Sequence, residues 1–352
     1  MSKKAKVGGQ AVIEGVMMRG EKGIATAVRK ADGKIEIKLE PIFPITKKNK
    51  ITALPFIRGF LNLIDSLIVG VKSLNYSSSF FEDDEEDGEP SKFEQWFYKV
   101  FKDKAGDIVV GISMLLGVAL AMLLFMVVPT AITGLIKKMN VDSSFILSFI
   151  EGIMSLVIFL LYLFAISKME DIYRVFQYHG AEHKTIYCYE NQLELTPENA
   201  DKFGTLHPRC GTNFMFLVMA VSIFLFSFLN WGSILERMFF KLLLLPVVSG
   251  ITYELIRWLG NTKSKLGHVI AYPGMMLQKL TTKQPDLEML EVAIVSLQVA
   301  EGIKTVEEIK NMQRDKSDEK AEEGTKLEQS VSEQEAGLSD KEVVEENNFS
   351  VE

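Results

Sequence analysis

The sequence predicts a mainly α-helical, polytopic membrane protein with about four transmembrane helices, a small N-terminal β-hairpin module and a disordered acidic C-terminal tail. Hydrophobic residues make up 47% of the 352 residues and charged residues 24%, so apolar and polar segments must be separated along the chain. Four apolar runs carry very few charges, whereas both ends of the chain are polar. These observations together favour a membrane-embedded core with polar appendages.

The predicted N-terminal module spans residues 1–50. Glycines punctuate the segment GGQAVIEGVMMRG, and the segments ATAVRK and KIEIKLE then flank the dipeptide Asp32-Gly33, which suits a tight hairpin turn. We therefore expect a glycine-rich loop followed by a β-hairpin. The loop lacks the G-x-x-x-x-G-K-[ST] spacing of a phosphate-binding loop, so a tight-packing role is favoured over phosphate binding.

Residues 51–79 are predicted to form an amphipathic helix that lies in the membrane interface or packs on the bundle. Its polar side chains gather on one side at 100° per residue, which argues against a spanning helix. These side chains are Arg58, Asn62, Asp65 and Lys72. An acidic linker, residues 80–104, follows and is expected to be solvated.

Two transmembrane pairs are predicted, in residues 105–166 and 214–260. A helix needs about 20 apolar residues to cross about 30 Å of hydrocarbon. The first run is longer than this and should tilt or kink near Pro129. The four expected spans are 108–136, 144–166, 214–231 and 239–259.

The distribution of Lys and Arg predicts that both termini and the central loop, residues 167–213, face the cytoplasm. Basic residues precede the first span, occupy the central loop and follow the last span. The exceptions near the two short outer turns are Lys137, Lys138, Arg237 and Lys241. The basic N-terminus leads into no apolar run, so no cleavable signal peptide is expected.

The segment after the last span divides into two parts. Residues 261–303 are expected to be cytoplasmic, with an amphipathic helix from Asp286 to Glu301 that begins just after Pro285. Residues 304–352 carry 7 basic and 15 acidic residues and too little apolar surface to fold. Because the net charge of the whole chain is −7, the remainder is nearly neutral, and no nucleic-acid partner is expected.

The central loop contains the strongest chemical signal, the motif His179-Gly180-Ala181-Glu182-His183. If residues 171–191 are helical, the two histidines lie at i and i+4 on one face and can reach one ion. In this H-x-x-E-H order, which is that of inverted zincins, the histidines bind zinc and the glutamate activates a water molecule. A second cluster, His207-Pro208-Arg209-Cys210, could supply one or two more ligands.

Other assignments for these residues stay open at this stage. The histidines could simply bond backbone carbonyls or lipid phosphates, and Gly180 costs a helix about 1 kcal/mol relative to alanine. Glu254, 71 residues after His183, is a further candidate ligand, or a buried charge paired with Arg257. Cys188 and Cys210 are expected to be free thiols or a metal ligand, and not a disulfide.

Several motifs together resemble the YqhQ-like family of bacterial multipass membrane proteins. They are GGQAVIEGVMMRG, YHGAEHKTIYCYE, TPEN with HPRCGTNF, GITYELIRWLG and PGMMLQKLTTKQPDLEMLEVAI. The resemblance runs from about residue 7 to residue 301 and implies a bacterial cytoplasmic-membrane location. It also implies a metal-dependent enzyme, but it names no reaction.

Two functions from different classes are therefore expected. The first is a zinc-dependent hydrolase, with zinc or another divalent transition metal on His179, His183 and either Cys210 or His207, and with Glu182 as general base. The second is a non-catalytic membrane factor in membrane-protein insertion, assembly or quality control, which would bind other membrane proteins as well as the lipid bilayer. The amount of amphipathic, non-spanning material motivates the second hypothesis.

Overall fold

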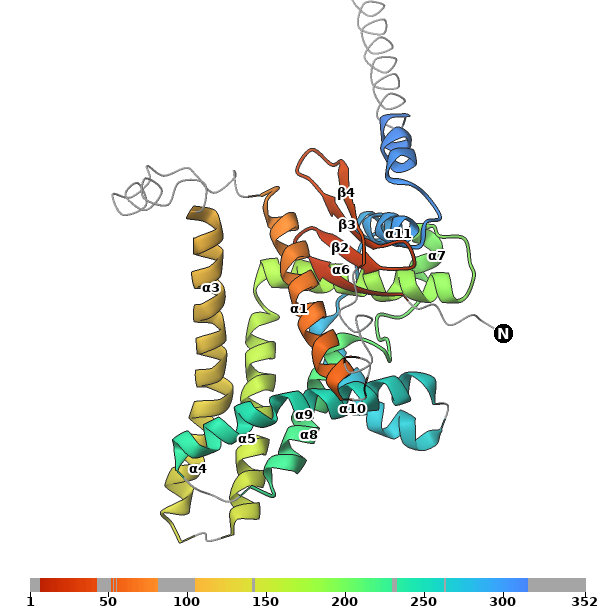
Figure 1. Ribbon diagram of the computed structural model, residues 1–352. Helices are drawn as coiled ribbons and strands as arrows, with labels where there is room; N and C mark the ends of the chain where they lie inside the picture. The colour runs from red at the N-terminus through yellow and green to blue at the C-terminus, as the bar shows by residue number, and fades with distance from the viewer. Residues whose placement is uncertain are drawn as a thin grey trace, which may run out of the picture.

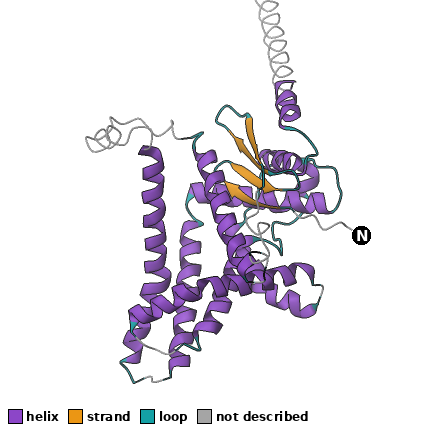
Figure 2. Ribbon diagram, in the orientation of Figure 1, coloured by secondary structure: helices purple, strands orange, loops and turns teal. Residues whose placement is uncertain are grey.

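The computed structural model describes residues 7–42, 52, 54, 56–81, 105–140, 143–229, 233–262 and 264–315. Figures 1 and 2 show a mixed α/β layer beside a bundle of long helices. The predicted acidic linker, apart from residues 80 and 81, and the predicted tail beyond residue 315 lie outside the described residues. The fold class expected from the sequence is confirmed.

A four-stranded antiparallel sheet forms the centre of the α/β layer. Its strands follow the chain in the order β1 (Gly8–Val12), β2 (Gly15–Arg19), β3 (Ile24–Arg29) and β4 (Ile35–Glu40). The hairpin expected at Asp32-Gly33 joins β3 to β4, and Gly33 has a φ of 79°. The expectation of a glycine-rich loop was wrong, because that segment forms β1 and β2, paired from Gly8 and Arg19 to Val12 and Gly15.

Helices cover both faces of the sheet. Side chains of successive strand residues point to opposite faces, and both faces carry apolar side chains here. One face, which includes Val16 and Met18, packs on α11 (Leu287–Glu301) and α6 (Glu170–Glu190). The other face, which includes Val12 and Met17, packs on apolar residues of α1 (Ile57–Ser78). The N-terminal sheet is therefore a middle layer, with α1 on one face and α6 and α11 on the other.

Helix α11 is more deeply buried than an amphipathic helix would be. Residues Met289 to Ala300 are nearly all buried, because the sheet lies on one side of α11 while α6 and α7 (Pro197–Asp201) lie against it elsewhere. Asp286 caps its N-terminus by accepting from the N–H of Met289, which confirms the expected start. The start of α7 at Thr196 and Pro197 has the same kind of cap.

Helix α1 links the sheet to the bundle, as the amphipathic pattern suggests. Near its start it crosses α9 (Ile234–Asn261) so closely that a Cβ on Gly59 would lie 2.8 Å from Cβ of Tyr253. A Cβ on Gly250 would lie 2.7 Å from Cα of Phe56. Further along, Ser77 accepts a hydrogen bond from the N–H of Ile13, which ties α1 to the end of β1.

Within the described residues, three helical segments are long and apolar enough to cross a membrane, which supports association with a lipid bilayer. They are Gly111–Lys137, Ser144–Ile166 and Leu235–Gly260. The run expected at 214–231 forms the 16-residue helix α8 (Gly211–Phe226). At 1.5 Å per residue, α8 is roughly 24 Å long, shorter than the hydrocarbon layer.

The first span contains a π-helical turn where the sequence predicts a kink. It runs through α3 (Ala105–Met122), η4 (Leu123–Val127) and α4 (Val128–Lys137). Proline has no N–H, so Pro129 cannot bond the carbonyl of Phe125 one turn earlier. The hydroxyl of Ser155 on α5 (Ser144–Ile166) donates to that carbonyl at 3.3 Å instead.

A buried ion cluster joins α4, α5 and α9. One carboxylate oxygen of Glu151 accepts from Arg237 at 2.8 Å, and the other accepts from Lys241 and Thr130. Arg237 also donates to the hydroxyl of Ser148 at 2.9 Å. Glu151 therefore faces the bundle interior and pairs with two cations, which lowers the cost of an ionisable side chain in an apolar span.

The C-terminal part holds two helices that the sequence did not predict. Helix α10 (Lys265–Thr281) packs mainly on α8, and a Cβ on Gly274 would collide with Asn213. The expected disorder from residue 304 was placed too early, because residues 306–315 are helical. Thr305 and Glu308 cap that helix reciprocally, and Gln313 bonds both backbone groups of Ile35 on β4.

Candidate metal centre

Helix α6 places both histidines of the H-x-x-E-H motif on one face, as the spacing predicts. Nδ1 of His179 bonds the carbonyl of Thr281 at 2.8 Å, and Nδ1 of His183 bonds the carbonyl of Thr205. A carbonyl can only accept, so each Nδ1 carries the proton and each Nε2 keeps its lone pair. This backbone anchoring of the far ring nitrogen is typical of histidines that bind metals.

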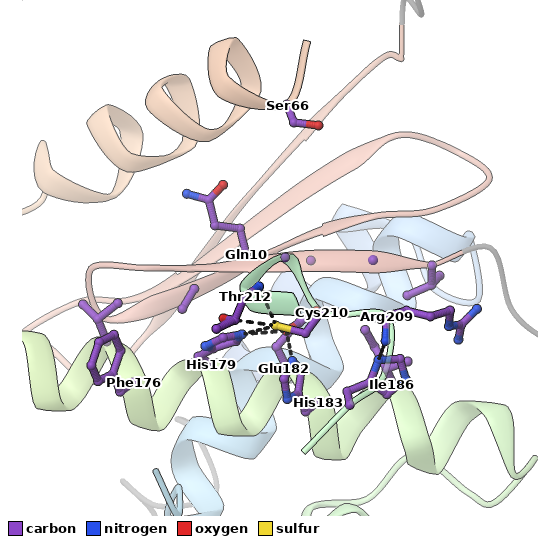
Figure 3. A pocket seen from close by; sticks show the side chains of 17 residues that line it. Gln10, Ser66, Phe176, His179, Glu182, His183, Ile186, Arg209, Cys210 and Thr212 are labelled. Carbon is purple, nitrogen blue, oxygen red and sulfur yellow. Dashed lines mark hydrogen bonds and ion pairs between the residues drawn. The ribbon is translucent and has the colours of Figure 1, made fainter. Parts of the chain in front are cut away.

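Cys210 brings a thiol to the same point from another part of the chain. It is the N-cap residue of α8, and its Sγ accepts from the N–H of Thr212 at 3.4 Å. The same sulfur lies 3.2 Å from Nε2 of His179. Figure 3 shows the sulfur between the two imidazoles and the start of α8.

Among the described residues, one group of His, Cys, Asp and Glu side chains has the geometry of a metal site: His179, His183 and Cys210. Their ligand atoms all lie within 4.8 Å of one another. Ligands at about 2.0 Å (N) and 2.3 Å (S) from a tetrahedral zinc are roughly 3.5 Å apart, so the donors need only small shifts to share one ion.

The environment of His183 fits metal binding better than a purely structural role. Its Nε2 is buried and has no hydrogen-bond partner among the described residues, although its Nδ1 is bonded. A buried polar atom without a partner is costly and needs an explanation, which a bound cation would supply. Burial also lowers the pKa of His183, so the imidazole is neutral, as a ligand must be, at neutral pH.

Glu182 lies beside this group but is not part of it. Its carboxylate is 3.4 Å from Nε2 of His183 and 3.9 Å from Nε2 of His179. Burial raises the pKa of Glu182, although electrostatic interactions with His179 and His207 and a hydrogen bond from the N–H of Gly9 act in the opposite direction. A carboxylate with a raised pKa is a stronger base than an exposed one.

Two glycines allow the backbone to approach the site closely. A Cβ on Gly9 would lie 2.8 Å from Cγ of Glu182, so strand β1 could not lie over the carboxylate with a larger residue there. A Cβ on Gly180 would lie 2.0 Å from the carbonyl oxygen of Lys283. Glycine at position 180 lowers the stability of the helix itself, but it allows α6 to pack against the segment that follows Thr281.

His207 lies next to the three converging residues without joining them. The side-chain amide of Gln278 bonds both its N–H and its carbonyl, at 2.8 Å each. Its ring centroid is 5.5 Å from that of His183, and its Nε2 is 3.9 Å from the carboxylate of Glu190. Of the two candidate third ligands, Cys210 therefore has the better position.

Glu254 is not near the candidate site, contrary to its suggested role as a further ligand. It forms a two-pronged ion pair with Arg58 of α1, at 2.7 Å and 2.6 Å. The sequence suggested Arg257 as its partner, because residues at i and i+3 are neighbours on a helix. The crossing of α1 over α9 supplies Arg58 instead, 196 residues away in the chain.

A cavity of about 440 Å³ opens onto the candidate metal centre. Strand β1 contributes its backbone to one wall, α6 forms the opposite wall, and Ser66 of α1 and Arg209 lie at the periphery (Figure 3). Arg209 is held by the carboxylate of Glu190. The glycine-rich strand therefore roofs the site, which leaves room for a small ligand or a chain segment.

Sequence patterns alone did not reveal three of the contributors to the site. The carbonyls of Thr205 and Thr281 and the amide of Gln278 carry no side-chain signature, since their roles depend on tertiary contacts. Gly9 and Gly180 did stand out, as glycines in a motif, but their contacts could not be inferred.

Two of three comparisons with known proteins found a match. The family model described as Protein of unknown function (DUF1385) matches residues 54–302. The chain is 34% identical over 291 residues to "Uncharacterized protein YqhQ" of Bacillus subtilis (strain 168), which covers 82% of this chain and 90% of that protein. No solved structure matches the chain. Both comparisons match most of the chain, and the chain therefore belongs to the DUF1385 family.

Proposed function

We propose that this protein is a metal-dependent hydrolase of a membrane surface. In this proposal, His179, His183 and Cys210 hold zinc or another divalent transition metal. The observation that carries it is the buried Nε2 of His183, which has no hydrogen-bond partner in the described part of the chain and converges with two other donors beside a carboxylate. Three protein ligands with an adjacent acid are typical of catalytic and not structural zinc sites.

The residues of the chain divide the chemistry between them. A zinc ion bound there would lower the pKa of a water molecule and polarise the substrate carbonyl. Glu182 takes a proton from the attacking water on its carboxylate and returns it to the leaving group. The carbonyls of Thr205 and Thr281 hold the imidazoles in place, and β1 keeps bulk water away from the carboxylate.

We further propose that the site faces the cytoplasm at the bacterial cytoplasmic membrane. Helix α5 ends at Ile166 and α8 begins at Gly211, so the site lies where two apolar helices meet a polar layer. The Lys and Arg distribution around the spans supports this orientation. Met139→Cys and Asn191→Cys place labels at exposed positions in the two opposite loops.

In intact cells, an impermeant thiol reagent should then modify Met139→Cys and spare Asn191→Cys. The unsubstituted chain, whose two cysteines are buried, is the background control. Modification of Asn191→Cys alone would invert the proposed orientation.

The metal itself is tested by elemental analysis of protein purified without a polyhistidine tag and supplemented with divalent metals. We expect close to one metal per chain, lost in His183→Ala and retained in His268→Ala, whose ring is exposed and bonds the carbonyl of Ser264. Less than a tenth of a metal per chain in the unsubstituted protein would refute the proposal.

Catalysis is tested with Glu182→Gln, which keeps the size of the side chain and removes the base. The variant should bind the metal normally and lose hydrolysis of a mixed library of peptides and esters by at least about a hundredfold. A variant that retains full cellular function would instead support the non-catalytic membrane factor.

A further inference from the structure

Strand β1 is the edge of the sheet and the wall of the site cavity at once. In the described part of the chain it pairs only with β2, so its other edge has no partner strand. Four of its five residues, Gly8 to Ala11, line the cavity. An open strand edge beside a catalytic site is a template for an extended backbone.

The direction of the Gly9 N–H shows which residues face that outer edge. It bonds the carboxylate of Glu182, which lies outside the sheet, so Gly9 points its backbone groups away from β2. Residues two apart in an antiparallel strand point to the same edge. Ala11 therefore directs its N–H and carbonyl to the outer edge, toward the same cavity.

The cavity runs alongside the strand and has chemically distinct ends. Strand β1 lies antiparallel to α6, because Gly9 lies over Glu182 while Glu14, just after the strand, bonds Arg174 at 2.5 Å. The ion pair of Glu14 and Arg174 lies just beyond the C-terminal end of β1. Arg209, paired with Glu190, lies among the cavity-lining residues away from that end.

The lining favours a peptide over a lipid headgroup. Glycines at positions 8 and 9 add no side chains, so another main chain can approach β1 to hydrogen-bonding distance. A strand rises about 3.3 Å per residue, and the N–H and carbonyl of every second residue face the same edge. This repeat matches an extended peptide and not an acyl chain. Ala11 supplies one such donor and acceptor pair in the cavity that His179, His183 and Cys210 also line.

We propose that the substrate is an extended polypeptide segment that adds to the outer edge of β1, so that a peptide carbonyl lies beside His179, His183 and Cys210. This inference rests on the proposed hydrolase function. Water is the co-substrate. Its oxygen bonds the carbonyl carbon, the carbon–nitrogen bond breaks, and the leaving nitrogen takes a proton from the water. No oxidant or reductant is required.

The test measures binding of hydroxamates to the full-length, metal-loaded protein in detergent. Acetohydroxamate probes the metal alone, and acetyl-trialanine hydroxamate adds a strand. Three analogues each replace one amide N–H of the peptide with an ester oxygen. Strand pairing predicts that affinity falls about five- to tenfold at alternate positions and little at those between, since only alternate N–H groups face the partner.

A variant supplies an independent arm. Ala11→Pro removes an outer-edge N–H and leaves the neighbouring pairs with β2 in place, so it should weaken the peptide hydroxamate about five- to tenfold and leave acetohydroxamate unchanged. Its melting temperature is compared with that of the unsubstituted protein. If the variant does not fold, the ester series on the unsubstituted chain still decides the question.

The outcomes separate the two proposals. No binding of acetohydroxamate would mean that the hydrolase proposal fails. Binding of acetohydroxamate with no gain from the peptide, or with ester effects that do not alternate, would overturn the strand-addition inference alone. Tighter binding of hexyl hydroxamate than of the peptide would also overturn it, in favour of an acyl substrate.

Discussion

Replacement of Gly180 by alanine sets two opposing effects against each other inside α6. Helix propensity alone predicts a gain of about 1 kcal/mol, because glycine is the poorer helix former. The structure predicts a loss, because the new Cβ would lie 2.0 Å from the carbonyl oxygen of Lys283. That oxygen must retreat by about 1.4 Å to reach the 3.4 Å at which ordinary contact begins.

This retreat cannot be absorbed by a flexible side chain, because the atom in contact belongs to the backbone. The N–H of Lys283 also bonds the carbonyl of Phe176 at 2.8 Å, so the segment is held on both sides. Overpacking of this kind costs about 1 to 3 kcal/mol, which offsets or exceeds the propensity gain. We expect a net loss of stability of up to about 2 kcal/mol.

The same displacement should weaken metal binding, since the carbonyl of Thr281, two residues before Lys283, orients His179. The measurement is the melting temperature in detergent together with metal content after dialysis. The matched control is Gly117→Ala in α3, where a Cβ would meet nothing within 4 Å. The control should be neutral or stabilising and should keep its metal. An equal or higher melting temperature and full metal content in Gly180→Ala would refute the reasoning.

Two further predictions concern the thiols and the buried ions. Alkylation of Cys210 should be slow in metal-loaded protein and fast after chelation. Burial raises the pKa of the Cys188 thiol, so Cys188 should react slowly in both states and faster only as pH rises. Equal alkylation rates for Cys210 with and without chelator would exclude it as a ligand. Glu151→Gln should lower the free energy of unfolding by about 3 to 5 kcal/mol, because it leaves Arg237 and Lys241 buried without their carboxylate. Lys241→Gln keeps the balanced pair of Glu151 and Arg237 and should lower it far less. Equal melting temperatures of the two variants would contradict this account.

Some features of the site could be predicted from local spacing. The i, i+4 placement of His179 and His183 follows from helical geometry, and the caps at Thr196 and Asp286 follow from residue preferences at helix starts. These are short-range effects, which a sequence contains in full. Three of the four expected spans could be found in the same way, from the length of the apolar runs, whereas the run at 214–231 forms the shorter helix α8.

Other features depend on contacts between distant parts of the chain. Helix α11 is buried nearly all round, although its sequence shows one clear apolar face, because the sheet and α6 both pack on it. The glycine-rich segment was expected to be a loop, since glycine disfavours strands. Its glycines are tolerated in β1 because Gly9 must lie against Glu182. Only the tertiary fold supplies that reason.

The buried ion cluster also removes part of the conflict in the charge distribution. Arg237 and Lys241 follow the second outer turn in the sequence and therefore count against a cytoplasmic central loop. The structure directs both side chains to Glu151 inside the bundle, so they are not loop charges of the kind that sets orientation. Lys137 and Lys138 at the end of α4 are then the basic residues near the outer turns that still oppose the proposed orientation. The basic residues of the layer that contains the candidate metal centre outnumber them, which supports a site on the cytoplasmic side of the membrane.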